Sequence, residues 1–433
     1  MNRLPSAEKP ENRLGPRSSS SDGASESRLK AGLDQARPQV HVVLGNEACD
    51  VDSMVSALVY AYFLHKTVGG ETVHIPLLNI RQSDLVLRSD NVFLLNQTGL
   101  SPDLLVFRDQ MDLPALQRAG RLRLTLVDHN VLPSSDRDLE GVVVEVVDHH
   151  LQERDPSTCS VTVETVGSCC TLVAERVLQK APDILDQQLA HLLYAAVLLD
   201  CVNMAPAAGK VTPKDSQVAA ALEMRFPGLP QRGALFQALQ KAKFDVSGLN
   251  TQQMLLKDMK AVSGSLSLVI SVLYVPLEDF LRPPDVEDEL TAFCRQLSLD
   301  LLVLMTISFT DTQQPVRELA VFSHSATCRD QLSQHLEQAQ NPALNLSPLS
   351  SPHPHITAYH QGNMLASRKK VLPLIKDFLR EEDGGGDMEE DSRVPPTPMN
   401  SLVDGCPLDG GLPGISAQAL QEKFCKMADR PDL

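Results

Sequence analysis

The chain has 433 residues, of which 42% are hydrophobic and 22% are charged, and its formal net charge at pH 7 is −16. This length allows two or three globular domains, and the excess of acid argues against non-specific binding to nucleic acid or to an anionic membrane surface. No apolar run reaches the roughly 20 residues of a membrane helix, and residues 1–32 lack the apolar centre of a signal peptide, so we expect an intracellular protein without membrane insertion.

Residues 1–38 are rich in Ser, Pro, Gly and charge, so we expect them to be disordered. From residue 39 onward, short β-branched apolar runs alternate with helical patterns, which is typical of a parallel sheet covered by helices on both faces. We therefore predict an α/β domain over residues 39–210. Its expected strands are 40–44, 72–78, 104–107, 122–127 and 142–147, and its expected helices are 53–66, 169–179 and 186–199.

Prolines interrupt the pattern over residues 211–231, which we interpret as a linker. A second, smaller α/β domain follows at 232–381. Its expected helices are 233–243, 251–260, 286–296, 329–338 and 369–381, and its expected strands are 266–275, 299–308 and 317–322. The remaining residues, 382–433, contain an acidic run and the segment Pro395-Pro396-Thr397-Pro398, so we expect a disordered tail.

Acidic residues follow several of the expected strands. Asp50 and Asp52 follow the first strand, Asp128 and Asp148 follow the last two, and Asp200 closes an apolar run. One such acid alone is usually a turn former or a helix cap. However, the carboxyl ends of the strands in an open α/β sheet lie together, and gathered carboxylates repel one another unless a cation neutralises them. The pattern therefore predicts a divalent metal site.

Histidines stand beside two of these acids, in Asp128-His129 and in Asp148-His149-His150. Carboxylates with one or two imidazoles and no cysteine suit Mg²⁺ or Mn²⁺. Two such ions that share a bridging carboxylate activate water and stabilise charge on phosphate oxygens. His129 could equally be a packed histidine that orients a neighbour. These residues predict a metal-dependent phosphohydrolase.

The motifs also resemble those of a known family, the DHH phosphoesterase superfamily. Residues 45–53, 127–130, 147–150 and 199–200 are similar, in order and spacing, to its four motifs, and residues 257–260 and 367–370 resemble those of its accessory DHHA2-type domain. Within the superfamily, the segments 45–50, 241–249 and 395–404 are similar to the animal prune branch of short-chain exopolyphosphatases. The resemblance covers about residues 39–433.

The resemblance implies two Mn²⁺ or Mg²⁺ ions in each active site. Asp50 and Asp52 would each bind one ion, Asp128 would bridge them, and His149 and Asp200 would complete the shell. The remaining implied residues act on the substrate: His150 beside the phosphate, Arg368 and Lys369 as a clamp on its oxygens, and His129, Lys257, Lys260 and Lys370 as weaker phosphate contacts. Without the resemblance, the basic run at 368–370 would be read as the solvated start of a helix.

Two local features leave alternatives open. Asn46 stands where related pyrophosphatases carry a histidine, so we expect one ion to lose an imidazole ligand and to bind more weakly. The helix that begins near Cys169 could hold an anion at its free amides, but we favour an ordinary cap by Ser168.

The expected activity is hydrolysis of the terminal phosphate of short-chain polyphosphates. The alternatives are a phosphodiesterase acting on cyclic AMP or cyclic GMP, and a largely non-catalytic scaffold that regulates cell migration. In prune relatives the tail is implicated in binding nucleoside diphosphate kinase, so the resemblance implies this partner for residues 382–433. It also implies a cytoplasmic location, with the nucleus and focal adhesions as further locations.

Overall fold

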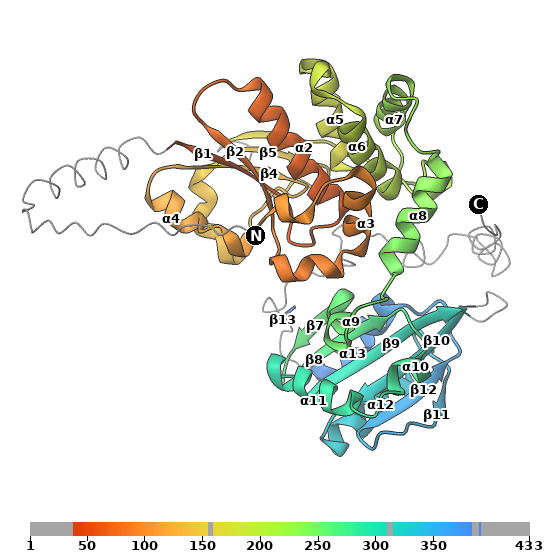
Figure 1. The fold of residues 1–433 in the computed structure, drawn as a ribbon. Helices are drawn as coiled ribbons and strands as arrows, with labels where there is room; N and C mark the ends of the chain where they lie inside the picture. Colours follow the sequence, from red (N-terminus) through yellow and green to blue (C-terminus); the bar gives the residue numbers. More distant parts are fainter. Residues whose placement is uncertain (1–37, 155–158, 310–314, 383–388, 391–433) are drawn as a thin grey trace, which may run out of the picture.

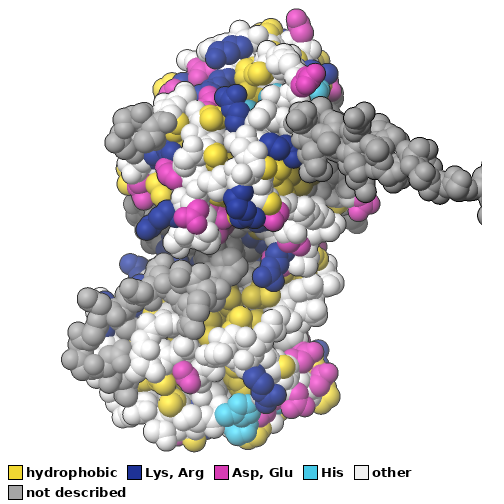
Figure 2. Space-filling model, turned by 90° about the vertical axis from the view of Figure 1, so that its left-hand side faces the viewer, with side chains coloured by type: hydrophobic (Ala, Val, Ile, Leu, Met, Phe, Trp, Pro, Cys, Tyr) yellow, Lys and Arg dark blue, Asp and Glu magenta, His cyan; other side chains and the backbone are white. Residues whose placement is uncertain are grey.

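The computed structural model describes residues 38–154, 159–309, 315–382 and 389–390, which form two lobes (Figures 1 and 2). Almost all of the two segments predicted to be disordered, 1–38 and 382–433, lies outside the described residues, so these two predictions stay untested. No helix in the described ranges combines the length and the apolar character that a membrane span requires.

The first lobe is built on a six-stranded, all-parallel sheet in the order β3-β2-β1-β4-β5-β6. The central strand β1 pairs with β2 on one side and with β4 on the other, so the strand order reverses between β1 and β4 (Figure 1). In such sheets the ligand crevice lies outside the carboxyl ends of these two strands. The strands are β1 Val40–Leu44, β2 Val73–Leu78, β3 Val106–Phe107, β4 Leu122–Val127, β5 Val143–Asp148 and β6 Ser160–Val163.

Helices cover both faces of this sheet, as predicted. Val43 packs on one face with apolar residues of α2, α5 and α6, whereas Val42 and Leu44 pack on the opposite face with Leu113 of α4. This alternation follows from the two-residue period of a strand. The helices are α2 Val51–Thr67, α3 Ser89–Thr98, α4 Leu113–Arg118, α5 Cys169–Lys180, α6 Gln187–Asp200 and α7 Pro213–Arg225. Short 3₁₀ segments are η1 Gln82–Leu87, η2 Pro102–Leu104, η3 Arg108–Gln110, η4 Ser134–Val142, η5 Pro182–Ile184 and η6 Pro206–Ala208.

The second lobe is built on a mixed sheet in the order β11-β12-β10-β9-β8-β7-β13, in which only the β8–β9 pair is parallel. Its strands are β7 Met259–Ser263, β8 Ser267–Leu273, β9 Leu301–Phe309, β10 Pro315–Phe322, β11 Leu346–Leu349, β12 Ile356–Gln361 and β13 Glu389–Glu390. Its helices are α9 Thr251–Lys257, α10 Leu277–Leu281, α11 Val286–Leu297, α12 Ala326–Gln338 and α13 Arg368–Glu382. Both lobes are therefore α/β.

The connection between the lobes differs from our expectation. The range 211–231, expected to be a linker, contains α7, because Thr212 caps the helix through the amide of Asp215 and Pro213 occupies its first turn. Helix α8, Arg232–Phe244, falls in the range expected for the second domain, yet its residues Leu235 and Leu239 pack in the core of the first.

Candidate metal centre

The carboxyl ends of β1, β4 and β5 carry the acidic side chains of the centre. Asp50 caps helix α2, accepting a hydrogen bond from the amide of Ser53 at 3.0 Å, and Asp52 lies in the first turn of the same helix. Asp128 directly follows β4 with a φ of 62°, a left-handed conformation that aspartate tolerates better than most residues. Asp148 is the last residue of β5. The strand order thus brings these acids together, as we expected.

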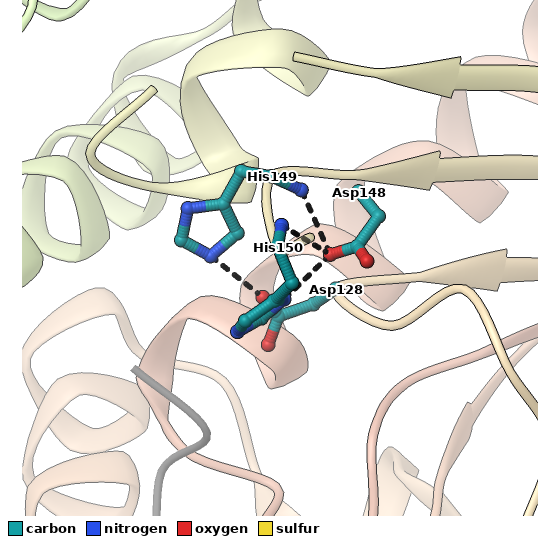
Figure 3. Close-up of side chains that lie close together, drawn as sticks. All are labelled: Asp128, Asp148, His149 and His150. Carbon is teal, nitrogen blue, oxygen red and sulfur yellow. Dashed lines mark hydrogen bonds and ion pairs between the residues drawn. The ribbon is translucent and has the colours of Figure 1, made fainter. Parts of the chain in front are cut away.

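His149 points its imidazole at two of the acids, of which Figure 3 draws Asp128. Its Nε2 lies 3.2 Å from Asp128 Oδ1 and 3.6 Å from Asp52 Oδ2. Its Nδ1 lies 2.9 Å from the carbonyl oxygen of Val166, which can only accept, so Nδ1 carries a hydrogen. A neutral His149 therefore turns the lone pair of Nε2 toward carboxylate oxygens. A proton or a metal ion must lie between them.

The electrostatics of the pocket favour a cation. Burial opposes the imidazolium, but the hydrogen bond to Asp128 and the charges of Asp128 and Asp52 outweigh it and raise the pKa of His149 to about 11. Burial, reinforced by the charge of Asp52, raises the pKa of Asp128 well above its usual range. Burial and the charges of Asp52 and Asp50 do the same for Asp200, at the end of α6. A divalent ion would relieve this repulsion without protonating the ligands.

Asp52 is held by the start of helix α5. Its carboxylate accepts hydrogen bonds from the amides of Cys169 at 2.6 Å and Cys170 at 2.7 Å, and from Ser168 Oγ at 2.8 Å. Our expectation of a Ser168 cap is therefore wrong, since its hydroxyl donates to Asp52 and makes no capping bond. The alternative was that the free amides hold an anion. They do bind one, and it is the carboxylate of Asp52 in the same protein.

Asn46 fixes the orientation of Asp128. Its Nδ2 donates to Asp128 Oδ2 at 2.6 Å, and its Oδ1 accepts from the amide of Cys49 at 2.9 Å. The partners determine which way the amide is turned, because the carboxylate only accepts and the backbone amide only donates. The residue that we regarded as a missing ligand thus positions the central carboxylate.

Asp148 has a role that the sequence analysis left unassigned. It accepts hydrogen bonds from His150 Nδ1 at 2.7 Å and from Asn130 Nδ2 at 2.6 Å. Although burial raises its pKa, these bonds, the charge of His150 and the amide of His149 hold it at about 2. Asp148 therefore stays ionised and leaves Nε2 of His150 as the nitrogen available to a substrate.

Several buried polar atoms of the centre have no hydrogen-bond partner among the described residues: Asp200 Oδ2, His150 Nε2 and His129 Nε2. His129 donates from Nδ1 to the carbonyl of Val127 at 2.9 Å, and burial lowers its pKa, so it is a neutral, packed ring. Donor atoms of Asp128, Asp148, His149 and His150 all lie within 4.8 Å of one another (Figure 3). Of the expected metal ligands, this group contains Asp128 and His149, whose carboxylate and imidazole suit Mn²⁺ or Mg²⁺, but not Asp50, Asp52 or Asp200.

The basic residues proposed as phosphate contacts lie in the second lobe, in different settings. Lys257 is only 1% exposed, and its Nζ donates to the carbonyl of Leu87 at 2.9 Å and to Ser89 Oγ at 2.8 Å. This ammonium joins α9 to the first lobe. It does not line an open site. Arg368 pairs with Asp258 at 2.5 Å, Lys260 is half-buried in β7, and Lys369 and Lys370 are exposed at the start of α13.

Sequence reasoning missed two further basic residues near the centre. Arg88 is buried and donates from Nε to the carbonyl of Ala48 at 3.0 Å, which supports the loop that carries Asp50. Lys243, in the last turn of α8, lowers the pKa of Asp50 through its charge, although burial and Asp52 raise that pKa overall. Lys243 lies in the segment 241–249, so the resemblance had pointed to its neighbourhood without giving it a role.

Comparison with known proteins agrees with this arrangement. The model of the DHH family, N-terminal domain, matches residues 41–197, and that of the DHHA2 domain matches residues 237–378. Exopolyphosphatase PRUNE1 of Bos taurus is 49% identical, over 92% of this chain and 96% of the relative, and that of Homo sapiens is 47% identical over the same shares. A manganese-dependent inorganic pyrophosphatase of Methanocaldococcus jannaschii is 27% identical over 50% of this chain and 66% of its own length.

These matches cover both lobes, and the two similar PRUNE1 proteins are spanned by this chain over nearly their whole length. The chain therefore belongs to the DHH superfamily, in the branch that joins a DHH domain to a DHHA2 domain and includes the PRUNE1 exopolyphosphatases.

Proposed function

We propose that the protein is a metal-dependent exopolyphosphatase that hydrolyses the terminal phosphate of short-chain polyphosphates. The observation that carries the proposal is the position of His149 Nε2, which faces the carboxylates of Asp128 and Asp52 at 3.2 and 3.6 Å. His149 thus lies between two buried carboxylates, where a bound cation would satisfy all three side chains. The names of the PRUNE1 relatives support polyphosphate as the substrate class.

We propose that Asp50, Asp52, Asp128, His149 and Asp200 would hold two Mn²⁺ or Mg²⁺ ions. When bound, such ions would supply an activated water and would neutralise charge on the phosphate oxygens. The amides of α5 keep Asp52 in place and Asn46 keeps Asp128 in place, so the ligands need little rearrangement.

His150 is the residue that we expect to touch the reacting phosphate. Its Nδ1 is committed to Asp148 at 2.7 Å, and its buried Nε2 has no partner among the described residues. From this position Nε2 can take a proton from a reacting water, and the ring that then carries two protons can donate to an oxygen of the departing phosphate. Asp148 orients the ring through its hydrogen bond to Nδ1.

The second lobe supplies positive charge to the substrate in this proposal. Arg368 and Lys369 would bind the phosphates away from the scissile bond, with Lys260 and Lys370 as further contacts. The pairing of Arg368 with Asp258 means that substrate has to compete for this guanidinium, or to bind beside it. We withdraw Lys257 from the phosphate contacts because its ammonium is engaged at the interface.

The test measures phosphate release from tripolyphosphate and pyrophosphate, and formation of AMP from cyclic AMP, in the presence of Mn²⁺ or Mg²⁺. We expect the wild type to prefer tripolyphosphate. Removing a residue that hydrogen-bonds to a metal ligand typically reduces metal affinity or activity about 10–100-fold. Asp128→Asn changes an expected ligand itself, so it should reduce phosphate release by more than about 100-fold. Ser83→Ala, at an exposed site in η1, is the matched control and should keep wild-type activity.

Three outcomes would reject the proposal. Equal phosphate release by the wild type and by Asp128→Asn would place the chemistry elsewhere. Hydrolysis of cyclic AMP to AMP without phosphate release from the other substrates would favour a phosphodiesterase. No hydrolysis of any substrate would favour a scaffold.

We also propose that residues 382–433 dock a protein partner, and that this partner is a nucleoside diphosphate kinase. Composition supports the docking role, since the tail combines a proline-rich segment with an acidic run. The choice of the kinase rests on the resemblance of residues 395–404 to the prune branch. Truncation after Glu382 should abolish binding of the kinase while phosphate release persists. Binding retained by the truncated chain would place the docking surface on the folded lobes.

A further inference from the structure

Three histidines and one glutamate meet on the surface of the second lobe, outside the metal centre. Glu287 lies in the first turn of α11, His324 follows β10, and His353 and His355 precede β12. Figure 2 shows histidine side chains gathered on this lobe. The four residues come from three separate segments, so their meeting is a product of the fold and not of one helix face.

The carboxylate of Glu287 lies between two imidazoles. His353 Nδ1 is 3.3 Å from Glu287 Oε2, and His355 Nε2 is 3.6 Å from Glu287 Oε1. The ring of His324 packs against that of His355, with 4.7 Å between the ring centroids. Each oxygen of the carboxylate therefore faces one imidazole nitrogen, and a third imidazole lies alongside.

Neighbouring groups fix the tautomers of two of these rings. His353 Nε2 lies 2.9 Å from the carbonyl of Leu281, which only accepts, so Nε2 carries a hydrogen. Thr291 gives its one hydroxyl hydrogen to the carbonyl of Glu287 at 2.7 Å, so His324 Nε2, at 2.9 Å from that hydroxyl, must donate as well. In their neutral forms both rings therefore keep a lone pair on Nδ1.

A lone pair on His353 Nδ1 cannot face a carboxylate oxygen at 3.3 Å unless a proton or a cation lies between them. Zn²⁺ binds imidazole nitrogen and carboxylate oxygen at about 2.0–2.2 Å, which puts two tetrahedral ligands about 3.4 Å apart. A carbonyl behind the second ring nitrogen, as Leu281 provides, is also the usual support of a metal-binding histidine. Asp288 and Glu289 add negative charge in the same turn of α11.

We propose that Glu287, His353 and His355, with His324 as the fourth ligand, bind one divalent ion of the Zn²⁺ class. Imidazole and carboxylate ligands without thiolate suit this ion. The donor atoms of these side chains do not all lie within 4.8 Å of one another among the described residues, so the ion would draw them together. His324 is exposed and the side chain of His355 is 39% exposed, so both rings can turn toward the ion. The ion would tie α11 to the connections before α12 and β12, and so would stabilise the second lobe. The proposal does not depend on the activity of the first lobe.

The test compares zinc bound to the full chain after dialysis against Zn²⁺, measured by elemental mass spectrometry. The wild type should hold one more ion per chain than either His353→Gln/His355→Gln or Glu287→Gln, because zinc in the metal centre is common to all three proteins. His335→Gln is the matched control. His335 lies 3.6 Å from Glu381, so it forms the same kind of pair without the cluster, and its loss should leave the zinc content unchanged.

Two further measurements distinguish loss of the ion from misfolding of the double variant. His355→Gln alone changes a side chain that is 39% exposed, so it should fold normally and bind the ion at least 10-fold more weakly. Visible absorption of bound Co²⁺ should show a tetrahedral spectrum that this variant weakens. Equal zinc content in the wild type and the double variant would overturn the proposal. A proton, and not a metal ion, would then lie between His353 Nδ1 and the carboxylate of Glu287.

Discussion

Asn46 shows how one residue can support a metal centre without being a ligand. Its Nδ2 donates to Asp128 Oδ2 at 2.6 Å, so Asn46→Ala would leave the central carboxylate free to rotate. We expect this variant to bind Mn²⁺ about 10–100-fold more weakly, as other losses behind a ligand do. Titration calorimetry measures the affinity, and Asn96→Ala, at an exposed site of α3, is the control. An unchanged affinity would mean that the backbone alone orients Asp128.

The location of a residue in the fold was predictable where it follows from the position of that residue at the end of a strand. The acids at 50, 52, 128 and 148 follow strands, and parallel strands end at one edge, so their convergence follows from the pattern. The role of Asn46 was not predictable, because it depends on which atoms face one another across 82 residues of sequence. The same holds for Lys257, whose partners are the carbonyl of Leu87 and the hydroxyl of Ser89.

The turn before α5 is the element on which the centre most depends. Gly167 packs so tightly that a Cβ would lie 2.4 Å from Cys201 Sγ and 2.5 Å from the carbonyl of Lys210. Gly167→Ala must therefore displace the turn that carries Val166 and Ser168, which hold His149 and Asp52. We expect a loss of about 1–3 kcal/mol in the free energy of unfolding, together with weaker Mn²⁺ binding.

Urea unfolding and metal titration measure the two effects. Gly141→Ala is the matched control, since a Cβ there meets nothing within 4 Å. If Gly167→Ala kept wild-type stability and affinity, the turn would be more compliant than its contacts indicate.

The contact between α9 and η1 should depend on pH through Lys257. Burial lowers the pKa of Lys257 from 10.5 to about 8, so between these values the unfolded chain binds more protons than the folded one. The free energy of unfolding should therefore rise with pH across this window and fall as the pH drops through about 8. Relative to Lys257→Met, the wild type should gain up to about 3 kcal/mol.

Urea unfolding between pH 7 and 10.5 measures this difference. Lys241→Met, which removes an exposed lysine of α8, should track the wild type. A difference between the wild type and Lys257→Met that is independent of pH would mean that the ammonium is not desolvated.

Elements were predictable in proportion to their apolar periodicity. Strands β1 and β4 match their predicted ranges residue for residue, because buried parallel strands read as continuous apolar runs. Helix α7 was missed because its proline was taken as a break, although proline in the first turn begins a helix. Helix 251–260 was predicted too long, since α9 ends at Lys257 and β7 begins at Met259.

The molecule as a whole has separate cores. The buried clusters of the first lobe run from Val40 to Leu239, and those of the second lobe run from Leu255 to Leu379. Two thermal transitions are therefore expected in calorimetry. Mn²⁺ at about 100 times its dissociation constant should stabilise only the first lobe, by about 2.7 kcal/mol, and Asp128→Asn should lose that shift. One merged transition that Mn²⁺ moves as a unit would contradict this expectation.

Between α8 and α9 the chain passes from one lobe to the other through only residues 245–250. Because Leu239 still belongs to the first core and Leu255 already belongs to the second, a crossover in this segment would cut through neither. Chimaeras that exchange everything after residue 250 between relatives should therefore fold, provided that the positions of Leu87, Ser89 and Lys257 are matched. Recombination at this point could therefore exchange the second lobe, and with it the proposed substrate contacts, while the first lobe and its metal centre stay unchanged.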